Sequence, residues 1–101
     1  MPRTLSVSRA KVNAADEAGY LAVLGDLARR LASRGESLWL FRHPEQRDTY
    51  LEFSESGTAE RHRSRAARTP EEAALEVRLR ALASYASDAG VLWEEVPLEK
   101  S

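Results

Sequence analysis

Residues 37–55, SLWLFRHPEQRDTYLEFSE, predict a β-hairpin whose first strand is apolar on both faces. Successive side chains of a strand point to opposite faces, so Leu38 and Leu40 share one face. Trp39 and Phe41 then lie together on the other. One face can pack against the chain's own helices, but the second would expose two large aromatic rings, which soluble monomers usually avoid. We therefore expect a partner subunit or a ligand to cover this second face.

A strand and a helix are predicted before the hairpin. Residues 4–12 alternate in the manner of a strand, with Leu5 and Val7 on one face and serines on the other. Asn13 stands where a helix N-cap would, and apolar residues then recur at helical spacing until Gly35, a typical residue just after a helix C-cap. The chain therefore begins with a strand followed by a long helix.

After the hairpin, a short polar helix is predicted over residues 59–66, capped by Thr58. Thr69 and Pro70 then give the strongest helix start in the chain, an N-cap followed by proline at the first helical position, with Glu72 completing a capping box. Apolar residues at helical spacing predict that this helix continues as far as Ala86. A last strand is expected over residues 91–96, after a break at Gly90.

The resulting order, β-α-β-β-α-β, predicts one α+β domain over residues 1–101 with a ferredoxin-like fold. In this fold an antiparallel sheet carries both helices on one face. The opposite face would be bare, so we expect two copies to pack face to face as a homodimer.

Composition excludes several classes of function. The 101 residues carry a net charge of −1, which predicts no attraction to nucleic acid or to an anionic membrane. The chain has no cysteine, and its two histidines are isolated, so no metal site is expected. No apolar run approaches the ~20 residues that span a bilayer, and no signal peptide is recognisable at the N-terminus. We expect a cytoplasmic protein.

The hairpin LWLFRHPEQRDTYLEFSES, the segment ERHRSRAAR and the closing VLWEEVPLE, together with the order of elements, resemble the dimeric α/β-barrel superfamily. Within it the chain is most similar to the antibiotic-biosynthesis-monooxygenase type of domain. The resemblance implies that two sheets pack into a barrel and that a cavity lies between each sheet and its helices. Some members oxidise polycyclic phenols without a cofactor, and others bind and degrade haem.

The haem-degrading members use an Asn on the first strand, a Trp after the third strand and a His on the following helix. Asn13 and His62 are the corresponding candidates here. The Trp has no counterpart, because Ser54 to Gly57 follow Phe53. The resemblance therefore disfavours haem degradation, and no cofactor is expected.

Candidates for catalysis are His62, Asn13 and Tyr50. His62 could act as a cavity base or an axial ligand, but among four arginines it also fits a solvated helix face. Tyr50 and Glu52 share one face of the third strand and could give a hydroxyl and a carboxylate to a cavity. The alternative for Glu52 is an interface ion pair with an arginine such as Arg42.

Trp39, Phe41 and Trp93 could line a pocket for a flat aromatic ligand, although the core of a dimer is the preferred interpretation. Two functions therefore remain open. The first is a module that binds a small apolar or aromatic ligand between helices and sheet, or that serves as a structural dimer. The alternative is a cofactor-independent, monooxygenase-like oxidoreductase acting on an aromatic substrate.

Overall fold

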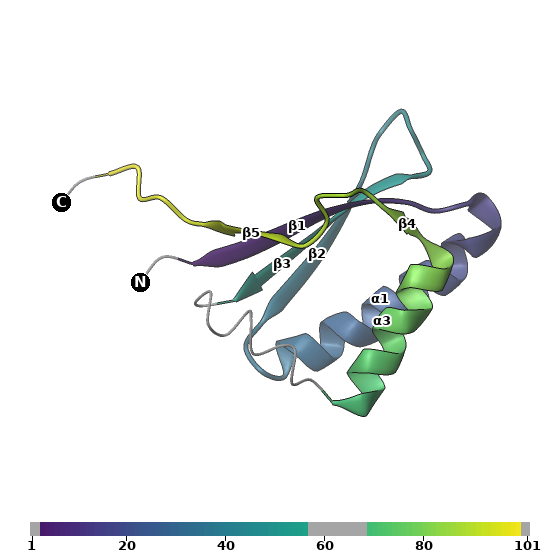
Figure 1. Ribbon diagram of the computed structural model, residues 1–101, viewed down its shortest axis with the longest axis horizontal. Helices are drawn as coiled ribbons and strands as arrows, with labels where there is room; N and C mark the ends of the chain where they lie inside the picture. Colours follow the sequence, from purple (N-terminus) through teal and green to yellow (C-terminus); the bar gives the residue numbers. More distant parts are fainter. Residues whose placement is uncertain (1–2, 57–68, 100–101) are drawn as a thin grey trace.

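The computed structural model describes residues 3–56 and 69–99, and their helices and strands follow the predicted order (Figure 1). The predicted helix over residues 59–66, with Thr58 and His62, lies outside the described residues. In chain order the elements are β1 (Thr4–Lys11), the short 3-10 helix η1 (Ala14–Asp16), α1 (Glu17–Ala32), β2 (Ser37–Arg42), β3 (Thr49–Ser56), α3 (Pro70–Leu82), β4 (Ser84–Tyr85) and β5 (Val91–Glu94).

The strands form one antiparallel sheet with the order β2-β3-β1 and with β4 and β5 both paired to the outer edge of β1. The fourth strand of the ferredoxin-like fold is thus made in two pieces. Both helices lie on the same side of the sheet (Figure 1). The predicted α+β, ferredoxin-like arrangement is confirmed.

The hydrophobic core lies where α1 and α3 meet the sheet. Tyr20 is fully buried there, and its ring packs on that of Tyr50 with the centroids 5.2 Å apart. The other buried core residues are Val12, Val23, Leu24, Leu27, Leu31, Leu75 and Leu79. Seven of these nine residues come from the two helices, so the helices supply most of the core.

The two central strands, β1 and β3, turn their polar side chains toward the helices. Ser6 and Ser8 of β1, with Glu52 and Ser54 of β3, line a space that leucines of both helices also line. Their apolar neighbours in sequence point to the other face. This arrangement is the reverse of the usual one, in which the face under the helices is apolar.

The face of the sheet away from the helices carries the large aromatic side chains. Trp39, Phe41 and Trp93 are 44%, 60% and 58% exposed. Phe41 and Phe53 meet edge to face, with ring centroids 5.4 Å apart. These rings, with Leu5, line a shallow groove that Arg3, Glu55, Glu94 and Glu95 border. No described helix covers this face.

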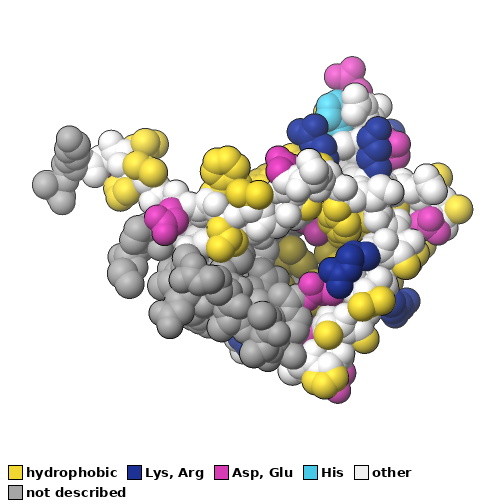
Figure 2. All heavy atoms as spheres, viewed as in Figure 1, with side chains coloured by type: hydrophobic (Ala, Val, Ile, Leu, Met, Phe, Trp, Pro, Cys, Tyr) yellow, Lys and Arg dark blue, Asp and Glu magenta, His cyan; other side chains and the backbone are white. Residues whose placement is uncertain are grey.

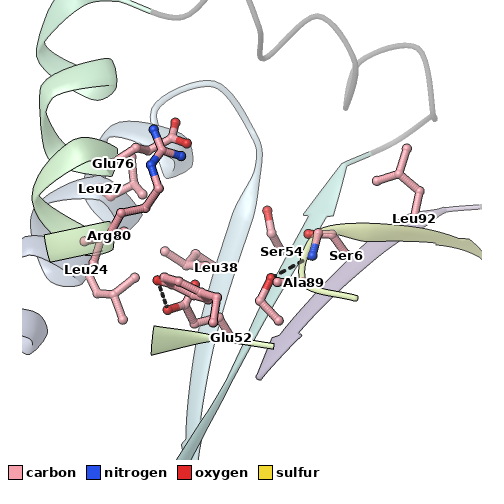
Figure 3. A pocket seen from close by; sticks show the side chains of 14 residues that line it. Ser6, Leu24, Leu27, Leu38, Glu52, Ser54, Glu76, Arg80, Ala89 and Leu92 are labelled. Carbon is pink, nitrogen blue, oxygen red and sulfur yellow. Dashed lines mark hydrogen bonds between the residues drawn. The ribbon is translucent and has the colours of Figure 1, made fainter. Parts of the chain in front are cut away.

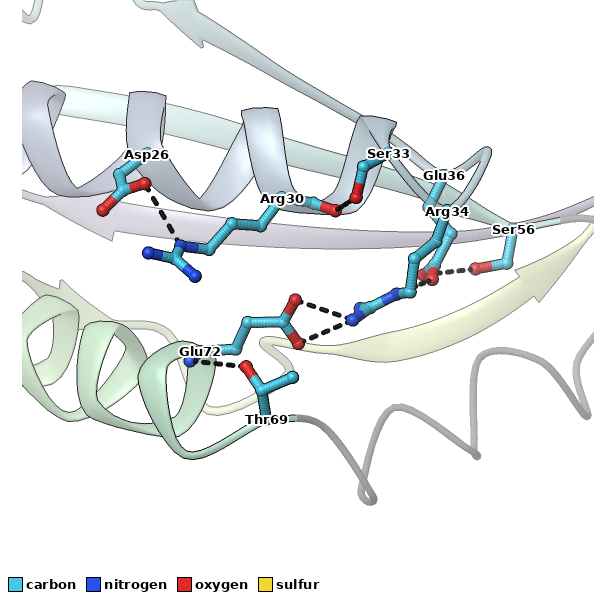
Figure 4. A network of polar contacts seen from close by, with 8 residues as sticks. All are labelled: Asp26, Arg30, Ser33, Arg34, Glu36, Ser56, Thr69 and Glu72. Atoms are coloured by element: carbon cyan, nitrogen blue, oxygen red, sulfur yellow. Dashed lines mark hydrogen bonds and ion pairs between the residues drawn. The ribbon is translucent and has the colours of Figure 1, made fainter.

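A network of ion pairs between the half-buried Arg34 and two buried carboxylates fixes α3 beside the sheet (Figure 4). The Arg34 guanidinium binds both oxygens of Glu72 at 2.8 and 2.6 Å and reaches Glu36 at 3.2 Å. Ser56 of β3 donates to Glu36 at 3.2 Å. Thr69 caps α3 as predicted, because its hydroxyl accepts from the Glu72 backbone N–H at 3.2 Å. The end of α1 and the start of α3 are therefore tied to β3.

The sequence prediction was wrong at two helix ends. α3 ends at Leu82 rather than continuing to Ala86, because Ser84 and Tyr85 pair with β1 as strand β4. Asn13 precedes the 3-10 helix, and α1 begins only at Glu17, with no side-chain hydrogen bond from Asn13 as a cap. Neither change alters the topology. In the described ranges, no helix is long and apolar enough to cross a membrane.

Candidate functional site

A cavity of about 530 Å³ lies between the sheet and the two helices. Figure 2 shows the surface hollowed between the sheet and α3, and Figure 3 shows the side chains around the cavity. The lining residues come from every strand and from both long helices: Ser6, Ser8, Leu24, Leu27, Leu38, Glu52, Ser54, Glu76, Leu79, Arg80, Tyr85, Ala89, Gly90 and Leu92. Five of these residues are leucines, and five of the seven polar or charged ones lie on the strands of the sheet.

The polar floor of the cavity consists of two rungs of the β1–β3 ladder that lie two residues apart. Ser8 is paired with Glu52, and Ser6 is paired with Ser54. Residues two apart on a strand point to the same face, so all four side chains face the helices. The Gly90 backbone N–H donates to the Ser8 hydroxyl oxygen at 3.0 Å, which holds the turn before β5 against the floor.

Glu52 is the centre of the site. The hydroxyls of Tyr20 from α1 and Tyr85 from β4 both donate to its Oε2, each at 2.6 Å. Burial raises the pKa of Glu52, while the two tyrosine hydrogen bonds act in the opposite direction. In the described ranges no hydrogen bond reaches Glu52 Oε1, so this oxygen can accept one from a ligand.

The two tyrosines remain protonated donors. Burial, and then the nearby Glu52 charge, raises the pKa of both Tyr20 and Tyr85 far above that of a free tyrosine. Arg80, on the helix wall, acts on Tyr85 in the opposite direction. Among the described residues no hydrogen bond or ion pair involves the Arg80 side chain, so this cation can also meet a ligand.

The predicted site residues lie in different places. Tyr50 is buried on the helix side, but its hydroxyl donates to Glu17, outside the cavity. Asn13 is exposed and does not line the cavity. His62 lies outside the described residues. Arg42 binds Glu17 at 3.2 Å, and Glu52 faces the helices, so the suggested Arg42–Glu52 interface pair is wrong.

Trp39, Phe41 and Trp93 lie on the opposite face of the sheet, and none of them lines the cavity. The sequence pattern did place Glu52 and Ser54 on one face of β3, together with Tyr50. It did not identify Tyr20 and Tyr85 as partners of Glu52, because they are 32 and 33 residues away in the chain. No group of three His, Asp or Glu residues that could hold a metal is found in the described part of the chain.

Comparison with known proteins identifies the fold. No family model matches the chain, and no curated protein is significantly similar to it in sequence. Solved structures do match over nearly the whole chain. The chain has the ferredoxin-like fold of the antibiotic-biosynthesis-monooxygenase-like proteins, as its resemblance to them predicted.

Three of these structures show the extent of the similarity. A conserved protein of unknown function from Bacteroides thetaiotaomicron, suggested to be an oxidoreductase, has a TM-score of 0.78 and 14% identity over 93% of this chain and 98% of that one. SnoaB, a cofactor-independent oxygenase from Streptomyces nogalater, has a TM-score of 0.73 and 18% identity over 99% and 97%. A protein from Chloroflexus aurantiacus, assigned as an antibiotic biosynthesis monooxygenase, has a TM-score of 0.69 and 16% identity over 100% and 97%.

The raised pKa of Glu52 predicts a specific pH dependence of stability. Because the folded protein binds this proton more tightly than the unfolded chain, ionising Glu52 costs folding free energy. Compared with a Glu52→Gln variant, the wild type should therefore lose stability as the pH rises above the unfolded pKa of about 4.3. Urea denaturation of both proteins between pH 4 and pH 8 measures this difference. A difference that stays constant, or that changes in favour of the wild type, would contradict the assignment.

Proposed function

We propose that the protein binds a small hydroxylated aromatic compound in the cavity between the sheet and the helices. The observation that carries this proposal is the polar floor, in which Glu52 and three serines replace the apolar residues expected under two helices. Positions where a chain breaks its own hydrophobic pattern are often functional. Binding sites of this kind are largely apolar, with a few polar groups that orient the ligand.

The chemistry of the cavity selects the type of ligand. Its volume of about 530 Å³ is within the range of roughly 300–1,000 Å³ that is typical of small-molecule sites. Leu24, Leu27 and Leu79 offer an apolar surface on the helix side, which suits a flat ring. Glu52 Oε1 on the sheet side suits a hydroxyl hydrogen, since an ionised carboxylate only accepts hydrogen bonds.

A purely structural dimer would have less use for this arrangement. A carboxylate that is taken out of water costs free energy unless hydrogen bonds compensate, and Glu52 receives two. An apolar residue at this position would fill the space and remove the cost. The presence of Glu52 on the floor of an open cavity is therefore better explained by ligand binding than by a structural role alone.

A second candidate function is oxygenation of the bound ligand without a cofactor. The specific observation in its favour is a buried carboxylate with a raised pKa, which is suited to remove a proton from a phenol near neutral pH. SnoaB, which shares the fold, is a cofactor-independent oxygenase. Oxidation of a phenol to a quinone balances with O₂ alone, because one oxygen atom enters the ring and the other leaves as water with the two hydrogens lost.

We also propose that two copies associate through the aromatic face of the sheet, as the hairpin pattern predicts. Covering the exposed parts of Trp39, Phe41 and Trp93, taken as about 100 Å² each, contributes roughly 7 kcal/mol per protomer at about 25 cal/mol per Å². Two protomers contribute about twice this value, which is at the upper end of the ~4–15 kcal/mol cost of association. The aromatic face therefore has enough apolar area for a dimer.

Ligand binding is tested with 2-naphthol as a fluorescent probe. We expect wild-type protein to bind it and Glu52→Gln to bind it about tenfold more weakly, because a hydrogen bond to a charged acceptor is replaced by one to a neutral acceptor. Ser84→Ala, an exposed change on β4 outside the cavity, is the matched control and should bind as the wild type does. Equal affinity for the wild type and the Glu52→Gln variant would refute the proposed site.

Oxygenation is tested with 1-naphthol, whose para position carries a hydrogen. In the presence of ¹⁸O₂ we expect 1,4-naphthoquinone with one labelled oxygen, formed without added metal or reductant and unaffected by a chelator. Loss of the base in Glu52→Gln should lower the rate at least roughly 100-fold. Binding without any turnover would leave the protein a ligand-binding module and exclude this second function for 1-naphthol.

Dimer formation is tested by sedimentation of wild type, Phe41→Asp and Val77→Asp. Phe41 and Val77 are 60% and 61% exposed, but Val77 lies on α3, away from the aromatic face. We expect a dimer for the wild type and Val77→Asp and a monomer for Phe41→Asp, because a buried unpaired charge opposes association. A wild-type monomer, or a Phe41→Asp dimer, would exclude the proposed interface.

A further inference from the structure

The register of β1 and β3 places a second polar position at a fixed distance from Glu52. Ser8 and Glu52 form one rung of the ladder, and Ser6 and Ser54 form another, two residues further along each strand. With a rise of about 3.4 Å per residue, the two rungs are roughly 7 Å apart. All four residues line the cavity, and Figure 3 shows Ser6, Glu52 and Ser54 beside it.

The hydroxyl of Ser6 can serve a ligand. In the described ranges no hydrogen bond involves this side chain, although Ser6 lies on the cavity floor. The Ser8 hydroxyl differs, because its oxygen already accepts from the Gly90 N–H. A serine hydroxyl both donates and accepts, so Ser6 can bind either a hydroxyl or a carbonyl oxygen.

Leucine side chains form the apolar part of the cavity wall. Leu24, Leu27 and Leu79 lie on the helix side, and Leu38 and Leu92 come from β2 and β5. A ring system that spans the two rungs would lie against these apolar side chains and have its oxygen atoms at its ends. A single ring with adjacent oxygens could reach one rung only.

We propose that Ser6 is a specificity-determining residue, and that the cavity selects aromatic ligands with two oxygen substituents roughly 7–8 Å apart, one at Glu52 and one at Ser6, which are diagonal neighbours on β3 and β1. This inference rests on the proposed function, because it requires that Glu52 receive a ligand hydroxyl. It adds a distance rule: fused ring systems with oxygens at opposite ends are preferred over those with one oxygen or with neighbouring oxygens.

Three naphthalene probes test the rule by fluorescence titration. 2-Naphthol has one hydroxyl, 2,3-dihydroxynaphthalene has two neighbouring hydroxyls, and 2,6-dihydroxynaphthalene has two at opposite ends. We expect the wild type to bind the 2,6-isomer roughly three- to tenfold more tightly than 2-naphthol, the gain of one further hydrogen bond. The 2,3-isomer has the same composition as the 2,6-isomer, so it controls for polarity. Any difference between its affinity and that of 2-naphthol should not depend on Ser6.

The variants identify the residue responsible. In Ser6→Ala the 2,6-isomer should bind no more tightly than 2-naphthol, whereas Ser84→Ala should keep the wild-type preference. Circular dichroism checks that each variant is folded, and Ser84→Ala, which lies outside the cavity, should keep the wild-type affinity for 2-naphthol.

The outcomes separate this inference from the proposed function. If all probes bind and depend on Glu52, but the 2,6-isomer has no advantage or keeps its advantage in Ser6→Ala, the distance rule is wrong and the ligand site stands. If no probe binds, or Glu52→Gln has no effect on any of them, the proposed function and the distance rule both fail.

Discussion

The structure depends on one carboxylate that joins three elements. Glu52 of β3 accepts the hydroxyls of Tyr20 from α1 and Tyr85 from β4, both at 2.6 Å. A carboxylate under two helices is stable only when hydrogen bonds replace the water that it has lost. The two hydrogen bonds that stabilise the Glu52 carboxylate in the cavity therefore also hold α1 and β4 in place relative to β3. The Arg34 network makes a second link at the far end of α1, so the helices are held at two places while the space between them stays open.

The polar floor has a consequence for the other side of the sheet. Because successive side chains alternate, a strand that turns serines toward the helices turns its apolar residues outward. Leu5 and Phe53 follow this rule on the two central strands, and the exposed rings of Trp39 and Trp93 join them from the neighbouring strands. The cavity and the aromatic face are thus two results of one sequence pattern.

Much of the fold could be predicted from the sequence, because its signals are local. The alternation in the hairpin, the spacing of leucines in α1 and the start at Thr69 all describe interactions between near neighbours, and each of these patterns corresponds to an element of the structure. The end of α3 could not be predicted in this way. Its apolar stripe continues past Leu82, but pairing with β1 and the hydrogen bond from Tyr85 to Glu52 outweigh the helical pattern. The candidate site was predictable only in part for the same reason. The pattern placed Glu52 beside Ser54, whereas contacts 32 and 33 residues away make that carboxylate the centre of a site.

The outer edge of the sheet is interrupted between β4 and β5. A long, straight edge strand presents a row of unpaired backbone N–H and C=O groups, to which another chain can add as a further strand. Here the edge consists of strands of two and four residues, separated by a turn that ends at Gly90 with a φ of +81°. The interrupted edge offers few consecutive unpaired backbone groups to a strand of another chain. Repeated addition of strands, which leads to fibrous aggregates, is therefore disfavoured at this edge of the sheet.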